Sequence, residues 1–132
     1  MTLTLTIPAP CDAGNKAQWI NANDRMHWAP KAALTRNWRE RTRALAHAQI
    51  LPLMTRAHIT ATVHKTTGRS YDVANLYPTI KAVIDGLVTD YGLLPDDDNA
   101  HLTGPDMRAG EKRDQACIVL TITPLPDGPD CD

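Results

Sequence analysis

The sequence contains no phenylalanine, and its three cysteines, Cys11, Cys117 and Cys131, lie far apart with no CxxC spacing. This pattern argues against a disulfide framework and against a zinc cluster. No apolar stretch approaches the roughly 20 residues that a membrane-spanning helix needs. The first seven residues lack the basic start and the long apolar block of a signal peptide. We therefore expect a cytoplasmic protein that has no membrane partner.

The chain is short, with 132 residues of which 42% are apolar. A chain of this size forms one domain, and it can bury enough surface to fold without a structural metal. The predicted domain covers residues 1–124. Residues 125–132 are acidic and rich in proline, which predicts a disordered tail.

The net charge of −1 seems to argue against a nucleic-acid-binding protein, but the charge is distributed unevenly along the chain. Residues 1–69 hold 10 Lys and Arg against 3 Asp and Glu, a charge of +7, whereas residues 70–132 hold 4 against 12, a charge of −8. This asymmetry indicates a basic binding surface beside an acidic site. The alternative is that the charges are scattered over a solvated surface.

Hydrophobic periodicity predicts the elements in the order strand, helix, strand, helix, strand, strand. Alternating apolar residues predict strands at 3–7, 57–65 and 115–123, with a further strand near 101–107. Helical spacing predicts one helix over about 30–49 and another from residue 76 to about 92. This order predicts an α+β fold, a single compact domain in which a mixed β-sheet packs against two main helices.

The first predicted helix has one apolar side and one basic side. Leu34, Trp38, Leu45 and Ala48 recur at a spacing typical of residues that face a core, and Arg36, Arg39 and Arg43 share another face. A long polar loop precedes this helix and contains Trp19 and Trp28. We expect these two tryptophans to anchor the loop to the core, although stacking on DNA bases is an alternative.

Acidic residues bracket the second predicted helix. Asp72 precedes it, Lys81 and Asp85 lie one turn apart within it, and Asp96 and Asp97 follow it. Hard oxygen ligands without nearby cysteine favour Mg²⁺ or Mn²⁺ over zinc. Phosphodiester hydrolysis needs a metal that activates water and neutralises phosphate charge, and a neighbouring ammonium group such as that of Lys81 helps. The alternative is a solvated acidic loop with a weak surface pair between Lys81 and Asp85.

The same residues resemble the RusA-like Holliday-junction resolvases, a family that is common in bacteriophages and prophages. That family has Asp-x-Asp-Asn-Leu before a helix, a Lys and then an Asp within it, and Gly-x-x-x-Asp-Asp after it. This chain has Asp72-x-x-Asn75-Leu76, then Lys81 and Asp85, then Gly92-Leu93-Leu94-Pro95-Asp96-Asp97. The resemblance extends more loosely from the first strand to about residue 124.

The resemblance implies a metal-dependent endonuclease that resolves four-way (Holliday) DNA junctions by paired, symmetric nicks as a homodimer encoded by a phage or prophage. Asp72, Lys81 and Asp97 are the implied catalytic residues, and Asp72, Asp97, Asp85 and Asp96 are the implied ligands of Mg²⁺ or Mn²⁺. For DNA binding, the resemblance and the basic composition together indicate Asn23, Arg25, His27, Arg36, Arg39, Arg43, Lys65, Arg69 and Asn75.

The sequence departs from the family pattern in two places. Ala74 occupies the position of the family's second acid, and the spacing from the first acid to the lysine is longer by about one helical turn. Either Asp85 or Asp96 completes the metal site, or the chain binds branched DNA as an accessory protein and cuts it weakly or not at all. A third possibility is an acidic-tailed interaction protein that does not bind DNA.

Overall fold

The computed structural model of the chain describes residues 1–25 and 27–126. Its elements are β1 (Leu3–Pro8), α1 (Trp28–Gln49), β2 (Ala57–His64), α2 (Tyr77–Asp85), β3 (Leu102–Ala109) and β4 (Cys117–Pro124). A 3-10 turn, η1 (Val73–Leu76), leads into α2, and a π-helical segment, η2 (Gly86–Asp90), extends it. The predicted order of strands and helices is confirmed. Most elements begin and end within one or two residues of the predicted positions.

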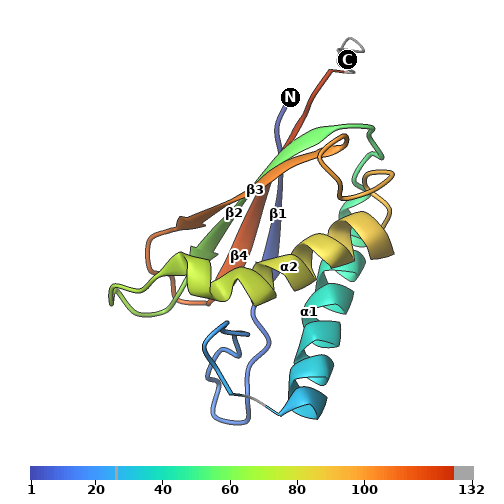
Figure 1. Ribbon diagram of the computed structural model, residues 1–132. Helices are drawn as coiled ribbons and strands as arrows, with labels where there is room; N and C mark the ends of the chain where they lie inside the picture. Colours follow the sequence, from blue (N-terminus) through green and yellow to red (C-terminus); the bar gives the residue numbers. More distant parts are fainter. Residues whose placement is uncertain (26, 127–132) are drawn as a thin grey trace.

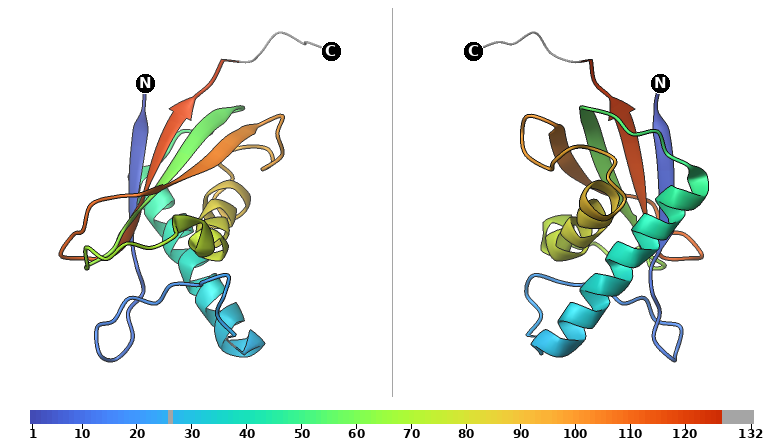
Figure 2. Two further views of the ribbon diagram at one scale, coloured as in Figure 1. Left: turned by 60° about the vertical axis from the view of Figure 1, so that its left-hand side comes forward. Right: turned by 90° about the vertical axis from the view of Figure 1, so that its right-hand side faces the viewer.

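The four strands form one mixed sheet in the order β1-β4-β2-β3. β4 runs antiparallel to both of its neighbours, whereas β2 and β3 are parallel and are joined by a connection that contains α2. Both helices pack on the same face of the sheet, and α1 crosses α2 at a steep angle (Figures 1 and 2). The predicted α+β domain with a mixed sheet and two helices is therefore confirmed.

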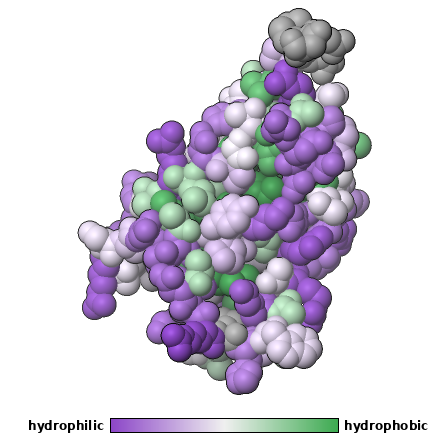
Figure 3. Space-filling model, viewed as in Figure 1, coloured by the Kyte–Doolittle hydropathy of each residue, from purple (hydrophilic) through white to green (hydrophobic). Residues whose placement is uncertain are grey.

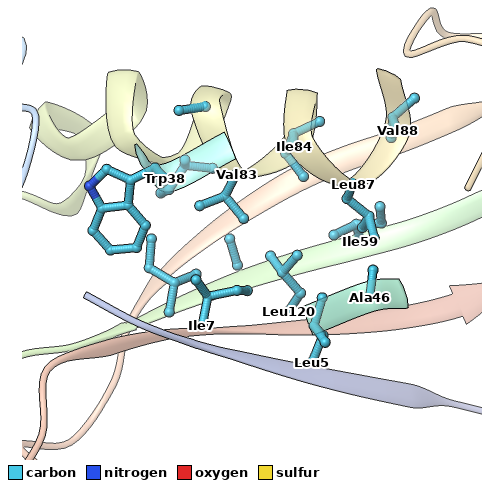
Figure 4. Close-up of a cluster of buried hydrophobic side chains, with 14 of the residues drawn as sticks. Leu5, Ile7, Trp38, Ala46, Ile59, Val83, Ile84, Leu87, Val88 and Leu120 are labelled. Atoms are coloured by element: carbon cyan, nitrogen blue, oxygen red, sulfur yellow. The ribbon is translucent and has the colours of Figure 1, made fainter. Parts of the chain in front are cut away.

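The hydrophobic core lies between the sheet and the helices (Figure 4). Alternation along the strands buries Leu5 and Ile7 of β1 and, as predicted for β4, Ile118, Leu120 and Ile122. Helix α1 contributes Trp38 and Ala46, and the α2 region contributes Ile80, Val83, Ile84 and Leu87. The prediction for Ala48 is wrong, because the buried side of α1 follows positions 34, 38, 42 and 46, which turns Ala48 to the solvent.

The two helices cross at Gly86, where η2 approaches the backbone of α1. A Cβ atom at this position would overlap the carbonyl oxygen of Arg39 and would lie 3.0 Å from the Cβ of Thr42. Only glycine allows this approach. Close by, Arg39 of α1 reaches Asp90 at the end of η2.

The loop over residues 11–25 is fixed to the helices by side chains from both of them, Trp38 of α1 and Thr79 of α2. The indole Nε1 of Trp38 donates to the carbonyl of Gln18 at 3.0 Å, and the ring of Trp38 stacks on Trp19 with centroids 5.5 Å apart. Trp19 thus anchors the loop as expected. The same expectation for Trp28 is wrong, because its side chain is 81% exposed at the first residue of α1.

Strand β3 forms one edge of the sheet, and its pairing with β2 is irregular. The register shifts between His58 and Thr60, opposite the stretch of β3 that contains Gly104 and Pro105. Close to this shift, just before β2 begins, Leu125 N donates to Arg56 O at 2.9 Å, and Arg56 donates to Pro126 O. Residues 125 and 126 are thus tied to the segment before β2, and residues 127–132 of the predicted tail lie outside the described residues.

Within the described part of the chain, none of the helices combines the length and the apolar character that crossing a bilayer requires.

Candidate active site

Lys81 lies between two carboxylates. Its Nζ donates to Asp85 Oδ1 at 2.8 Å and to Asp97 Oδ2 at 2.8 Å. Asp85 is one turn further along α2, and Asp97 comes from the loop that follows η2, so the chain must reverse direction to bring it back. The pair of Lys81 and Asp85 is thus not an isolated surface pair, because a third residue joins it from a distant segment. We call these three residues the lysine cluster.

Lys81 and Asp97 keep their charges over a wide pH range. The hydrogen bonds from Lys81 to Asp85 and then to Asp97 raise the pKa of Lys81 above its usual value, and this effect exceeds the opposing effect of burial. The same bond to Lys81 lowers the pKa of the Asp97 carboxyl. The side chain of Lys81 is still 43% exposed, so a charged ligand can reach it from solvent.

A hollow of about 100 Å³ opens beside the lysine cluster. Lys81 and Asp97 form its charged side, and Tyr77, Ile84, Leu102, Gly104 and Pro105 form the remainder. Tyr77 is 46% exposed although it belongs to the first turn of α2. The hollow therefore has a charged wall next to an apolar wall.

The other two predicted metal ligands serve as local caps. Asp72 Oδ1 accepts a hydrogen bond from Ala74 N at 3.0 Å and begins η1. Asp96 Oδ1 accepts from Asp97 N at 2.7 Å. Among residues 1–25 and 27–126, no three His, Cys, Asp or Glu side chains are placed to hold one metal ion. The structure thus brings Asp85 and Asp97 together and leaves Asp72 outside the lysine cluster.

The lysine cluster nevertheless fits a hard divalent cation in its donor chemistry. Both carboxylates already converge on one cationic group, the ammonium of Lys81. Mg²⁺ commonly binds through one or two carboxylates and completes its coordination with water and substrate phosphates. Asp85 and Asp97 are thus of the ligand type that such a site uses.

The predicted polar loop lies against the motif that precedes α2. Ala22 N donates to Asn75 O at 2.7 Å, and Thr79 bonds the backbone of Ile20. The neighbouring residues Asn23, Arg25 and His27 are all exposed. The structure thus brings this loop and Asn75 to the same side of the molecule.

The predicted basic face of α1 is partly neutralised within the protein. Arg39 makes two hydrogen bonds to Asp90, at 2.8 and 2.7 Å, and Arg43 makes two to Glu40. These bonds lower the pKa of the Asp90 and Glu40 carboxyl groups. Arg36 is exposed on the same helix. The partner of Arg43 lies three residues away and was visible in the sequence, whereas Asp90 comes from a different element.

Lys65 and Arg69 lie at the other end of the sheet, in the connection from β2 to η1. The Nζ of Lys65 sits 4.1 Å from the centroid of the Tyr71 ring, a cation–π contact that holds the ammonium in place. Two residues near these sites were missed by the sequence analysis, Tyr77 and Lys112. Tyr77 interrupts the apolar spacing of its helix, and this irregularity is the signal that identifies it.

No protein-family model matches the chain, and no curated protein matches it in sequence.

Proposed function

We propose that this protein is a metal-dependent, structure-specific endonuclease that resolves four-way DNA junctions by paired, symmetric hydrolysis of phosphodiester bonds. The lysine cluster is the proposed active centre. The observation that carries the proposal is the position of Lys81 Nζ, 2.8 Å from both Asp85 and Asp97 and beside an open hollow.

Lys81 is the residue that contacts the reacting phosphate in this proposal. An ammonium group has three N–H donors, and Asp85 and Asp97 accept two of them. The third donor can bind a phosphate oxygen in the hollow, where it stabilises the negative charge that develops during hydrolysis. Because the two carboxylates raise the pKa of Lys81, the group stays protonated and acts as a donor and never as a base.

Asp85 and Asp97 would hold Mg²⁺ or Mn²⁺, which would supply a water molecule of lowered pKa and neutralise phosphate charge. The carboxylate of Asp97 belongs to a loop, whereas that of Asp85 is fixed on a helix. Asp85 therefore fixes the position of Lys81, and Asp97 closes the lysine cluster from the opposite side. In this scheme Asp72 and Asp96 keep the flanking turns in shape.

The homodimer and the junction specificity rest on the family resemblance. A four-way junction is cut at two opposed strands, so two identical active centres related by symmetry match its shape. Contacts to phosphates would supply most of the affinity. We likewise propose a cytoplasmic site of action in a bacterial host, with a phage or prophage origin.

One observation favours a second function, binding of branched DNA without cutting. Ala74 has no ligand atoms, and Asp72 is engaged as the cap of η1 outside the lysine cluster. If metal binding requires a third carboxylate, the chain recognises junctions but does not hydrolyse them.

The test is cleavage of an end-labelled immobile four-way junction in Mg²⁺ or Mn²⁺, with linear duplex as the control substrate. Asp97→Asn removes one charge from the lysine cluster. Asp98→Asn is the matched control, because Asp98 is exposed and its carboxylate accepts a hydrogen bond from Ala100 N and lies 3.9 Å from His101, away from the lysine cluster. We expect symmetric nicks from the wild type and from Asp98→Asn, and none from Asp97→Asn, with junction binding retained in all three.

The two functions give different results in this experiment. A junction that the wild type shifts on a gel but leaves uncut in every metal contradicts the endonuclease and supports the binding protein. Equal cleavage of junction and linear duplex contradicts the specificity for four-way junctions.

A further inference from the structure

A second hollow lies at the end of the sheet, away from the lysine cluster. Because β2 and β3 are adjacent and parallel, the connections that leave them emerge at the same end, and these are the segments 65–71 and 109–112. Together they enclose about 370 Å³. Figures 1 and 2 show the two connections side by side, and Figure 3 shows mainly hydrophilic side chains at this projecting end.

The walls of this hollow are braced by hydrogen bonds between the two connections. Gly110 N donates to Val63 O at 2.8 Å, and Arg113 N donates to Lys65 O at 2.9 Å. The imidazole Nδ1 of His64 bonds the carbonyl of Glu111 at 2.9 Å. Gly110 packs so closely on His64 that a Cβ atom would collide with the imidazole ring. The hollow is therefore a preformed part of the fold.

The hollow is basic. Lys65, Arg69 and Lys112 line it, with Glu111 as the acidic residue among its lining side chains. Lys65 is held over the ring of Tyr71, so its side chain is already restricted before a ligand binds. Binding an anion there therefore loses less side-chain conformational entropy. Three cations and one carboxylate favour binding of an anion. Among the described residues, the lining contains no pair of carboxylates that would hold a metal for hydrolysis of the bound anion.

We propose that the hollow lined by Lys65, Arg69 and Lys112 binds a phosphate of the DNA backbone. This proposal rests on the function proposed above and adds a second anchoring point to it. Tyr71 lines the hollow and directly precedes Asp72, so the hollow lies next to the residues that lead into α2. The contact is independent of base sequence, because it involves only the phosphate.

The test measures DNA affinity against salt concentration in EDTA, so that no cleavage occurs. Lys112→Gln and the pair Arg69→Gln/Lys112→Gln remove exposed cations from the hollow. Arg56→Gln is the matched control, since Arg56 precedes β2 at the opposite end of the same strand. Each phosphate contact makes the slope of log affinity against log salt concentration steeper by about 0.9. One contact therefore accounts for roughly a 3.5-fold loss of affinity between 50 and 200 mM salt.

Because the hollow holds one phosphate, we expect the slope to fall by no more than about one in Lys112→Gln and in the double variant, with a larger loss of affinity in the double variant and equal losses on junction and duplex. Arg56→Gln should match the wild type. A slope and an affinity in Lys112→Gln equal to those of the wild type would overturn the proposal. So would equal shifts of the Gly110 amide resonance by inorganic phosphate and by an oligonucleotide at the same concentration, because the ligand would then be free phosphate.

The failure of this proposal is distinct from that of the proposed function. If the wild type binds junctions without cutting them and Lys112→Gln lowers the salt slope of binding, the endonuclease is contradicted and the phosphate site in the basic hollow is supported. A wild type that cuts junctions, with an unchanged slope in Lys112→Gln, contradicts only the basic hollow. A wild type that binds no DNA contradicts both.

Discussion

The hydroxyl of Thr79 makes two hydrogen bonds to the backbone of Ile20, a residue 59 positions earlier in the chain. It accepts from Ile20 N at 2.7 Å and donates to Ile20 O at 2.8 Å. Both residues are fully buried or nearly so. One side chain on the first turn of α2 therefore fixes the loop that carries Asn23 and Arg25 beside Asn75.

Thr79→Val removes this hydroxyl without changing the size of the side chain. The N–H and C=O of Ile20 then stay buried without a partner, and each such group costs about 1–3 kcal/mol. We expect the free energy of unfolding to fall by roughly 2 kcal/mol or more in urea titrations. Thr35→Val is the control, because its hydroxyl bonds Lys31 O within α1 near the surface, and equal losses in both variants would contradict the prediction.

Gly86→Ala tests the helix crossing. The new Cβ overlaps the Arg39 carbonyl, and overpacking of this kind costs about 1–3 kcal/mol, against a gain in helix propensity of about 1 kcal/mol. We expect a net loss of thermal stability in calorimetry. Gly68→Ala, where no atom lies within 4 Å, should stay within about 0.5 kcal/mol of the wild type. A Gly86→Ala protein as stable as Gly68→Ala would contradict the crossing geometry.

The two tryptophans of α1 should differ sharply in their effect on stability. Trp38 is fully buried and bonds Gln18 O, whereas Trp28 is 81% exposed. Trp38→Ala should cost about 3–5 kcal/mol, and Trp28→Ala less than about 0.5 kcal/mol. Denaturant unfolding measures both, and Trp38→Phe gives an intermediate loss if Trp38→Ala does not fold. A large loss in Trp28→Ala would show that Trp28 anchors the loop after all.

The lysine cluster predicts a characteristic pH dependence. The pKa of Lys81 is raised in the folded state, so its contribution to stability is complete below the unfolded value, about 10.4, and is lost as the pH rises through the folded value. The pKa of Asp97 is lowered, so its contribution is present above about pH 3.9 and is lost as the pH falls through the folded value. Between about pH 5 and 9 the lysine cluster should therefore contribute a constant amount.

NMR titration of the Lys81 Nζ resonance measures this effect directly. We expect a pKa above the ordinary lysine value in the wild type and a smaller rise in Asp97→Asn, since Asp85 still accepts one bond. A Lys81 pKa at or below the ordinary value would show that the two carboxylates do not hold the ammonium.

Local patterns in the sequence predicted the fold well. The alternation of Thr with Leu or Ile in β1, and the apolar spacing of the α2 region, depend on neighbours that are close in sequence, and both are confirmed. The buried face of α1 was predicted less well, because Ala48 is small enough to suit either side of a helix. The burial of Thr42 depends on the packing of the helices and on a bond from its hydroxyl to Trp38 O, which spacing does not reveal.

The candidate site was predicted in composition and only partly in geometry. The sequence indicated Lys81, Asp85 and Asp97, and the structure brings these three together. It also indicated Asp72, whose carboxylate caps its own turn because Ala74 N lies within reach. The pairing of Arg39 with Asp90 and the basic hollow around Lys112 depend on contacts between distant segments, so no local pattern shows them.

The irregular edge strand β3 has a consequence for association between copies of the chain. A flat edge strand exposes a row of unpaired N–H and C=O groups that can recruit another strand, which is a route to aggregation. In β3, Pro105 has no N–H group to donate, and the register shift opposite it interrupts the regular pairing of β2 and β3. Strand addition along this edge would be interrupted in its middle, so the fold carries a built-in barrier to uncontrolled growth of the sheet.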